Sequence, residues 1–202
     1  MRIILAITGA SGAQYGLRLC EELLAAGHIL TFLVSRAGFE VLKAEVGLDW
    51  SGSEQEVSSR LRAHFQVPEE RLSYYAGDNL LAPVASGSSV ADAMVVCPCS
   101  MGSLARIACG ISGTLMERSA DVMLKEKRLL VLVPRETPLS EIHLENMLKL
   151  ARLGTRIVPA MPALYHAPQS VEEMIDFVVG KVLESLGLGH TLYRPWNPVA
   201  KR

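Results

Sequence analysis

An arginine and a glutamate stand side by side directly after a predicted strand. The apolar run from Leu129 to Val133 predicts a buried strand, and the segment Pro134-Arg135-Glu136-Thr137-Pro138 ends it. In an open α/β sheet, ligands bind just beyond the carboxyl ends of the strands. Arg135 offers a cation to an anionic ligand, and Glu136 offers a carboxylate that can exchange a proton with it. The alternative for Glu136 is a surface glutamate paired with a lysine.

A glycine-rich turn follows the first predicted strand, Ile3 to Thr8. The turn, Gly9-Ala10-Ser11-Gly12-Ala13, separates this strand from a segment with helical spacing. The first N–H groups of a helix are unpaired and its dipole is positive there, so the turn predicts an anion site. The Ser11 hydroxyl adds a donor. The alternative is a tight turn with a serine cap and no ligand.

The sequence around this turn favours a mononucleotide over a dinucleotide. The turn departs from the G-x-G-x-x-G pattern, and Ser35-Arg36 follows the second predicted strand, Ile29 to Val34. NAD-binding folds place an acidic residue there to bind the adenosine ribose. We therefore expect a ligand such as FMN, which flavodoxin-like folds hold at the strand ends.

A third strand, Ala91 to Cys97, is expected to end at Pro98 and to lead into another turn. Ser100, Gly102 and Ser103 offer hydroxyl and backbone donors at the start of the next helix. Their small side chains also leave room for a flat ring. This turn therefore predicts a second part of the flavin site.

Two cysteines in this loop do not predict a metal or redox centre. Cys97 and Cys99 form C-x-C, which lacks the second ligand pair of a zinc site and differs from the redox motif C-x-x-C. We expect Cys97 in the core and Cys99 as a small turn residue, and no metal.

Arg118 and Lys125 share one face of a predicted helix, roughly 10 Å apart along its axis. The alternative is a solvated face on which both pair with Asp121. A phosphate pocket would form if Arg135, Lys181 and Tyr165 joined them near Ser11 above the sheet. Such a pocket stabilises a phosphate leaving group without a metal.

Composition limits the class of protein. The chain has 202 residues, 50% hydrophobic and 20% charged, with a formal net charge of -1. This charge argues against a nucleic-acid partner, and four cysteines in a chain of this length do not make a disulfide framework. No apolar stretch approaches the ~20 residues of a membrane helix, and no signal peptide precedes the first strand. We expect a soluble, cytoplasmic protein.

Strands and helices alternate along the chain, which predicts an α/β fold with a doubly wound parallel sheet, Rossmann-like or flavodoxin-like. We expect one flavin-binding domain over residues 1–202, with a C-terminal tail at 187–202. Helices are expected at residues 14–26, 38–46, 53–66, 104–109, 115–125, 140–153 and 171–186, and a further short strand at 156–158.

The chain resembles the flavin prenyltransferase (UbiX) family. The resemblance covers essentially the whole chain and is carried by five segments in order: residues 9–13, 97–103, 120–128, 135–139 and 162–166. It implies a Rossmann-like fold, a dodecamer with sites at subunit junctions, and a tail at a subunit interface. It also implies metal-independent transfer of a dimethylallyl group from dimethylallyl monophosphate to reduced FMN, with bonds at flavin N5 and C6. The prenylated FMN then serves a UbiD-type decarboxylase in ubiquinone biosynthesis or aromatic-acid decarboxylation.

The resemblance also implies roles for individual residues. It places FMN near Gly9, Ala10, Ser11, Ser35, Ser100, Met101, Gly102, Ser103 and Arg135. It places the prenyl phosphate near Arg118, Lys125, Arg135, Tyr165 and Lys181. Catalytic roles are implied for Ser11, Glu45, Arg118, Lys125, Glu136 and Trp196. An aromatic face such as Trp196 stabilises a cation-like allyl group, although the tail residue alternatively packs on a neighbouring subunit.

Two other functions compete with this interpretation. A flavin-dependent cysteine-type decarboxylase shares the superfamily, but it carries an Asn-rich loop and a Pro-x-Met-Asn motif where this chain has Ser100-Met101-Gly102-Ser103 and Pro134-Arg135-Glu136-Thr137. A non-catalytic FMN carrier explains the glycine-rich turns but leaves Lys125, Lys181 and Glu136 without a role.

Overall fold

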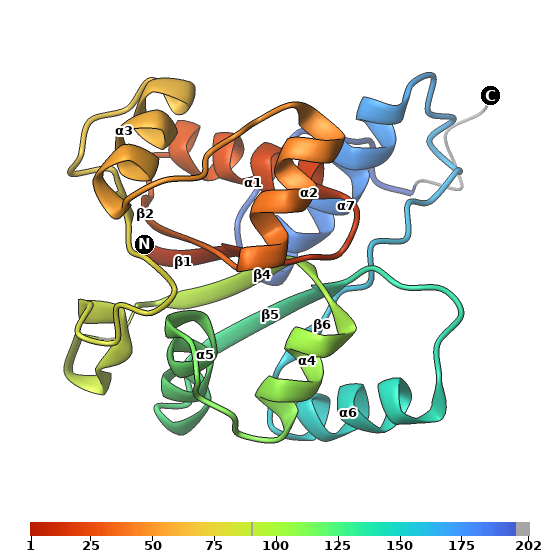
Figure 1. Cartoon of the computed structure of the whole chain (residues 1–202). Helices are drawn as coiled ribbons and strands as arrows, with labels where there is room; N and C mark the ends of the chain where they lie inside the picture. Colours follow the sequence, from red (N-terminus) through yellow and green to blue (C-terminus); the bar gives the residue numbers. More distant parts are fainter. Residues whose placement is uncertain (90, 197–202) are drawn as a thin grey trace.

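Strands and helices alternate in the computed structural model, which describes residues 1–89 and 91–196 (Figure 1). The strands are β1 (Arg2–Ile7), β2 (Ile29–Val34), β3 (Leu72–Tyr74), β4 (Ala93–Cys99), β5 (Leu129–Pro134) and β6 (Arg156–Ile157). The helices are α1 (Ala13–Ala25), α2 (Arg36–Val46), α3 (Glu54–Phe65), α4 (Met101–Ala108), α5 (Leu115–Lys125), α6 (Glu141–Arg152) and α7 (Val171–Ser185), with short 3-10 turns η1 (Pro83–Ala85) and η2 (Gly87–Ser89).

The six strands form one parallel sheet in the order β3-β2-β1-β4-β5-β6. The predicted doubly wound α/β fold is therefore confirmed. The chain winds outward from β1 in one direction and from β4 in the other, so the strand order reverses between these two neighbours. In folds of this kind, ligands bind in the crevice at that reversal, outside the carboxyl ends of the strands.

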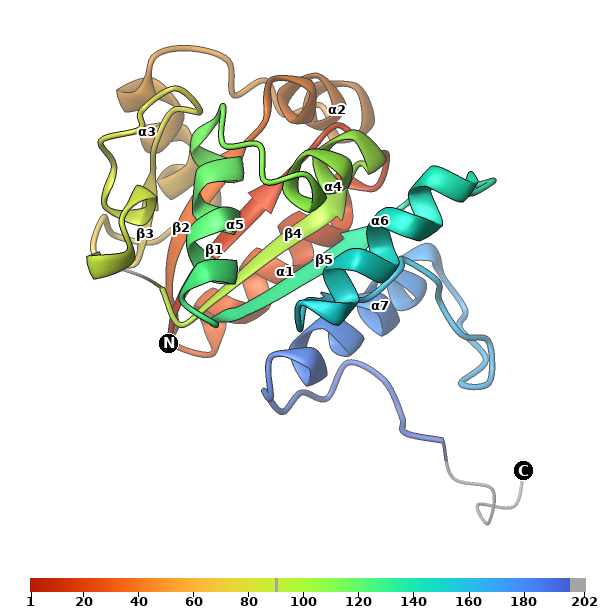
Figure 2. The same ribbon diagram turned by 90° about the horizontal axis from the view of Figure 1, so that it is seen from below.

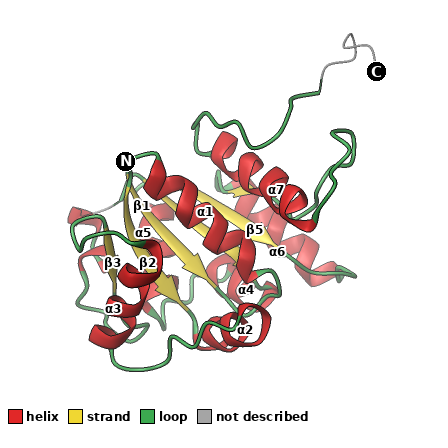
Figure 3. Cartoon of the chain, turned by 90° about the horizontal axis from the view of Figure 1, so that it is seen from above, coloured by secondary structure: helices red, strands yellow, loops and turns green. Residues whose placement is uncertain are grey.

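The two faces of the sheet carry separate hydrophobic layers. Alternate side chains of β1 point to opposite faces: Ile3, Leu5 and Ile7 pack with the buried faces of α1, α2, α3 and α7 (Figure 3). Ile4 and Ala6 pack with α4, α5 and α6 (Figure 2). Because both faces are covered, the central strands read as unbroken apolar runs rather than as alternating ones.

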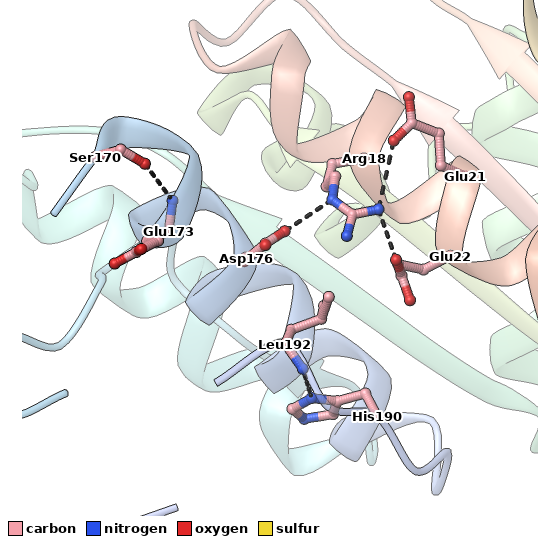
Figure 4. A network of polar contacts seen from close by, with 8 residues as sticks. All are labelled: Arg18, Glu21, Glu22, Ser170, Glu173, Asp176, His190 and Leu192. Carbon is pink, nitrogen blue, oxygen red and sulfur yellow. Dashed lines mark hydrogen bonds and ion pairs between the residues drawn. The ribbon is translucent and has the colours of Figure 1, made fainter. Parts of the chain in front are cut away.

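An ion-pair network joins α1 to α7 on the first of these faces (Figure 4). Arg18 on α1 donates from Nε to Asp176 on α7 at 2.8 Å, and its Nη1 lies 2.6 Å from Glu22. All three side chains are partly exposed, so each pair contributes about 1 kcal/mol or less. The network links α1 to α7, whose buried apolar face packs in the same core layer and which leads into the C-terminal tail. The structure describes the predicted tail as far as Trp196, and residues 197–202 lie outside the described part.

Two helices begin earlier than the sequence pattern predicts. Ser35 caps α2 by accepting a hydrogen bond from Gly38 N, and Ser100 caps α4 by accepting one from Ser103 N. The predicted starts, 38 and 104, are the first residues of the apolar helical pattern. The first turn of each helix lies before that pattern begins, so the prediction leaves it out. The caps bring both serines to the sheet edge.

Strand β4 does not end at Pro98, and β3 was not predicted. β4 continues to Cys99, which pairs with Pro134 of β5 after a local shift in register. Proline lacks an N–H, but its carbonyl still accepts hydrogen bonds, and Thr8 supplies them. β3 is a three-residue strand at the edge of the sheet, too short to give a pattern. Among the described residues, no helix is long and apolar enough to cross a membrane.

Candidate active site

Four loops meet at the carboxyl edge of the sheet. They follow β1, β2, β4 and β5, which are neighbours in the sheet. These loops and the first turn of α4 contain all of the predicted flavin-site residues: Gly9, Ala10, Ser11, Ser35, Ser100, Met101, Gly102, Ser103 and Arg135. Parallel strands end at the same edge, so the topology alone places these residues around one region.

Thr8 joins the loops on either side of the β1–β4 reversal. Its hydroxyl donates to the carbonyl oxygen of Pro98 at 2.8 Å and accepts from the N–H of Ser100 at 2.7 Å. Its own N–H also donates to Pro98, at 3.2 Å. Thr8 is fully buried. The two loops are therefore held as a single unit, and the start of α4 is fixed relative to the glycine-rich turn.

Arg135 connects β5 to the same turn. Its Nε donates to the carbonyl oxygen of Ser11 at 3.0 Å. Among residues 1–89 and 91–196, the guanidinium makes this hydrogen bond only, so Nη1 and Nη2 are available to a ligand. The Arg135 backbone N–H also reaches Cys99, at 3.4 Å. A half-buried cation thus lies at the centre of the four loops.

The N-terminus of α1 is occupied by a carboxylate of the chain itself. Glu45 Oε2 accepts from the N–H groups of Gly12 and Ala13 at 2.8 and 3.0 Å. Partial burial opposes ionisation, but the hydrogen bonds from Ser11, Gly12 and Ala13 outweigh it and lower the pKa of Glu45. Glu45 therefore fills the place where the sequence predicts a ligand anion, and it holds the turn in shape.

The first turn of α4 is open instead. A side chain added at Gly102 would meet no atom within 4 Å, whereas one at Gly9 would lie 2.5 Å from the Ala37 side chain. Gly9 is thus a packing requirement, and Gly102 borders free space. Ser100 donates its hydroxyl to Ser103 at 3.0 Å, so the polar groups of this turn are already ordered. The α4 terminus and Arg135 are the groups best placed for an anion.

Glu136 lies at the rim of an adjoining cavity of about 300 Å³, which Arg135 also lines. Its carboxylate accepts from the N–H of Thr137 at 3.0 Å and is exposed. Pro159 and Met161 line both this cavity and a neighbouring one of about 420 Å³. The second cavity contains Lys181. The cavity that contains Lys181 and the cavity that contains Arg135 and Glu136 therefore adjoin each other at Pro159 and Met161.

Lys181, Tyr165 and Trp196 belong to one aromatic cluster around α7. The Lys181 ammonium lies 5.7 Å from the ring centre of Phe177, and the Tyr165 ring lies 5.8 Å from the same ring. Trp196 packs edge-on against Tyr165 at 5.4 Å. Lys181 pairs with Glu184 at 2.8 Å. That hydrogen bond, with a second one that Lys181 donates to Tyr193, raises the pKa of Lys181 above its usual range.

Arg118 and Lys125 lie elsewhere in this chain. Lys125 is the last residue of α5 and pairs with Glu126 at 2.7 Å, near the start of β5. Arg135 follows the other end of β5, whose six residues span about 20 Å. Arg118 pairs with Asp121 at 2.8 Å, as the alternative interpretation expects. A single chain does not bring these two cations to the four loops.

Both loop cysteines are buried and reduced. Cys97 is a core residue, as predicted, but Cys99 is the last residue of β4 and packs in the second core layer rather than in the turn. Desolvation raises the pKa of Cys99 to about 12, so its thiol is protonated at neutral pH. In the described part of the chain, no three His, Cys, Asp or Glu side chains are grouped to hold a metal ion.

Sequence reasoning missed two contributors to this region. Thr8 joins two loops, and the only signal for it is a polar residue at the end of an apolar strand. Glu184 holds Lys181, accepts from Tyr193 and lies 3.4 Å from His190. Its spacing of one helical turn from Lys181 is a signal that the sequence does contain.

The comparisons with known proteins agree with this geometry. The Flavoprotein family matches residues 1–183. The flavin prenyltransferase UbiX of Alkalihalophilus pseudofirmus is 50% identical over 191 residues, 95% of this chain and 94% of the relative. A crystal structure of AnUbiX in complex with FMN and dimethylallyl pyrophosphate is 40% identical, with a TM-score of 0.86 over 97% of both chains.

A dodecameric FMN-dependent UbiX-like decarboxylase from Escherichia coli is 38% identical, with a TM-score of 0.84 over 98% of this chain and all of the other. These matches cover most of the chain, and they confirm the resemblance drawn from the sequence. This chain belongs to the flavin prenyltransferase (UbiX) family of flavoproteins.

Proposed function

We propose that this protein transfers a dimethylallyl group from dimethylallyl monophosphate to reduced FMN, releasing inorganic phosphate and prenylated FMN. The observation that carries the proposal is the set of three loops, after β1, β4 and β5, tied together by Thr8 and Arg135, in a chain 40% identical to a relative whose crystal structure contains FMN and dimethylallyl pyrophosphate. Close identity to flavin prenyltransferases favours this function over the cysteine-type decarboxylase and over an FMN carrier.

FMN fits the open part of this edge. Arg135 Nη1 and Nη2 and the first turn of α4 supply donors for its phosphate, and the free space beside Gly102 admits a planar ring. Gly9, Ala10, Ser11 and Ser35 complete the surrounding wall. Reduced FMN supplies the two ring atoms, N5 and C6, to which the allyl unit becomes bonded.

The chain's own residues then act on the phosphate ester. The ester C–O bond breaks with its electron pair leaving on phosphate, and fixed cations stabilise the charge that develops there. Lys181 and Arg135 line adjoining cavities and serve this role from within the chain. Glu136, at the same rim, passes the proton that ring closure releases to the departing phosphate. Tyr165 and Trp196 present aromatic faces to the cation-like allyl group.

We infer that Arg118 and Lys125 act in the site of a neighbouring copy. Lys125 lies at the opposite edge from Arg135, Arg118 is paired with Asp121 instead of facing the four loops, and a dodecameric relative makes a shared site available. Exposed apolar side chains on α6, Ile142 at 67%, Leu144 at 52% and Leu148 at 51%, mark a surface suited to subunit contact. We extend this proposal to the whole assembly. Each chain forms a single domain, twelve copies form a homo-dodecamer, and the tail, 187–202, contacts a neighbouring subunit.

The product's recipient is proposed from the family alone. Prenylated FMN would be released to a UbiD-type decarboxylase, in ubiquinone biosynthesis or aromatic-acid breakdown. A cytoplasmic location is part of the same proposal.

The test is an anaerobic incubation of the purified protein with reduced FMN and dimethylallyl monophosphate, followed by mass spectrometry of the extracted flavin. A mass gain of one isoprene unit with release of phosphate is expected, and a parallel reaction with the pyrophosphate ester identifies the donor. Lys149→Ala, on the exposed side of α6, serves as a matched control for cation variants. Unchanged FMN beside an active control enzyme would defeat the proposal, and carbon dioxide release from a peptide ending in cysteine would support the rival decarboxylase.

A further inference from the structure

A third cavity, of about 380 Å³, opens at the amino edge of the sheet. Its walls come from the end of α5, the start of β5 and the turn between α6 and β6. Helices α5 and α6 cover the same face of the sheet (Figure 2). The six residues of β5, about 20 Å, separate this cavity from Arg135. It is therefore distinct from the four loops described above.

The charged residues that line this cavity are all cationic. They are Lys127, Arg128 and Arg156, and no Asp or Glu is among the described lining residues. Of these cations, Arg156 donates to the carbonyl oxygen of Ser185. The adjacent acid, Glu126, is already paired with Lys125 at 2.7 Å. Three cations around one cavity favour a ligand that carries two negative charges.

These cations are not needed to close the helix ends. The last carbonyl groups of α5 accept from main-chain N–H groups, Lys127 to Leu124 at 3.2 Å and Arg128 to Met123 at 2.9 Å. Lys127 itself has a φ of 55°, a left-handed conformation that glycine adopts at lower cost. Gly154 takes the equivalent conformation after α6, with a φ of 92°. A lysine is less favourable than glycine in this backbone conformation, but it adds a positive charge to the cavity.

A polar group without a partner lies in the wall. Thr155 lines the cavity and is only 5% exposed, and its hydroxyl oxygen has no hydrogen-bond partner among the described residues. A buried hydroxyl without a partner is unfavourable, and a threonine hydroxyl can both donate and accept. Rotation about the Cα–Cβ bond is the motion that would turn it toward a ligand oxygen. The remaining wall is mainly leucine, including Leu124 and Leu153.

We propose that this basic cavity binds a small phosphate ester that carries a short hydrocarbon chain. The phosphate lies among Lys127, Arg128 and Arg156, and the hydrocarbon lies against the leucines. The size of the cavity is within the range of small-molecule sites. The basic cavity and the cavity beside Arg135 share no lining residue, so binding at the two places can be measured separately.

The test is calorimetric titration of the FMN-loaded, assembled protein with n-butyl phosphate, which lacks the allylic bond and is not a donor. We expect one more bound ester per chain in the wild type than in the Arg128→Gln/Arg156→Gln variant. Arg152→Gln, at the exposed end of α6, should retain the wild-type number of sites. Titration with inorganic phosphate measures the contribution of the phosphate group without the hydrocarbon chain. We expect inorganic phosphate to bind at least fivefold more weakly than n-butyl phosphate.

Equal numbers of sites in the wild type and the double variant would overturn the proposal, as would an equal loss in Arg152→Gln. Equal affinities for phosphate and its butyl ester would overturn the role of the leucines. Thr155→Val keeps the side-chain shape and removes the hydroxyl. It should weaken binding at this site at least threefold without lowering the thermal midpoint, and unchanged affinity would contradict the role given to Thr155.

Discussion

Arg135 donates its Nε–H to the carbonyl oxygen of Ser11 at 3.0 Å, across 124 positions of sequence. This bond joins the loop after β5 to the loop after β1, although β4 lies between the two strands. It also fixes the plane of the guanidinium, so that Nη1 and Nη2 point in a set direction. Orientation of a planar cation is what distinguishes arginine from lysine at a phosphate site.

Replacing Arg135 should therefore weaken flavin binding. In Arg135→Gln the cation and the link to Ser11 are both lost, and we expect the Kd for FMN to rise about 10- to 100-fold, the range of a lost charge-assisted hydrogen bond. Fluorescence titration of FMN measures it. Arg135→Lys restores charge but not the fork and should recover only part of the affinity. Wild-type affinity in both variants would show that Arg135 does not contact the flavin.

Glu45 should stabilise the fold in a pH-dependent way. Its pKa is lowered in the folded state, so its contribution is full above the ordinary value near 4.5 and is lost as pH falls through the lowered pKa. At neutral pH, Glu45→Gln should reduce the free energy of unfolding by about 0.3–1 kcal/mol, as for an anion at an exposed helix N-terminus. Urea unfolding at matched protein concentration measures the difference.

The difference between the two proteins should shrink as the pH falls below about 4.5 and should vanish once the pH has passed below the lowered pKa of Glu45, because the wild-type carboxylate is then protonated. Glu40→Gln, on the exposed face of the same helix, is the control and should change little at neutral or acid pH. A difference between wild type and Glu45→Gln that persists unchanged in acid would argue that the charge of Glu45 is not what holds the turn.

Gly16 should tolerate no side chain. It lies in α1, where a Cβ would stand 2.3 Å from the carbonyl oxygen of Cys97, an atom of the β4 backbone. Alanine in the middle of a helix normally adds about 1 kcal/mol of stability relative to glycine, but overpacking against fixed backbone costs about 1–3 kcal/mol. We expect Gly16→Ala to lower the thermal midpoint. Gly77→Ala, which meets no atom within 4 Å, is the control, and an equal midpoint for both variants would contradict the packing shown here.

A shared active site should allow two inactive variants to restore activity in one assembly. Lys125→Ala should lose at least 100-fold in turnover while still binding FMN, and Arg135→Gln should fail at flavin binding. If Lys125 acts in a neighbouring subunit, refolding the two together leaves about one quarter of the junctions with both native residues. Prenylated flavin formed by the mixture, but by neither variant alone, is the expected outcome. A mixture as inactive as its parts would place Lys125 outside its neighbour's site.

The secondary structure followed closely from local patterns. β2 and α5 have the predicted bounds, and Ser140 caps α6 as expected, because apolar periodicity and capping residues are local signals. The predicted strand stops before Pro98, whereas β4 continues to Cys99, because the hydrogen bonds to the Pro98 carbonyl come from Thr8, 90 positions away. No window of neighbouring residues contains that information.

Some parts of the candidate site could be predicted from the sequence, and others depend on contacts between distant segments. The loops after β1, β2, β4 and β5 could be placed together once the parallel sheet was recognised, because topology fixes where strands end. Glu45 was singled out by resemblance, but its bonds to Gly12 and Ala13 depend on how α2 packs beside the turn. The position of Lys125 at the far edge follows from the direction of α5, and its role depends on copies of the chain beyond this one.

The carboxylate that caps α1 has a consequence for how the flavin enters. A strand-to-helix turn usually leaves its first amides vacant, and an incoming phosphoryl group settles on them. In this protein the Glu45 carboxylate already accepts hydrogen bonds from these amides, and its negative charge repels a ligand phosphate. The ligand must therefore approach with its anionic end directed away from α1 and toward α4, so its polarity in the crevice is determined by exclusion as much as by attraction.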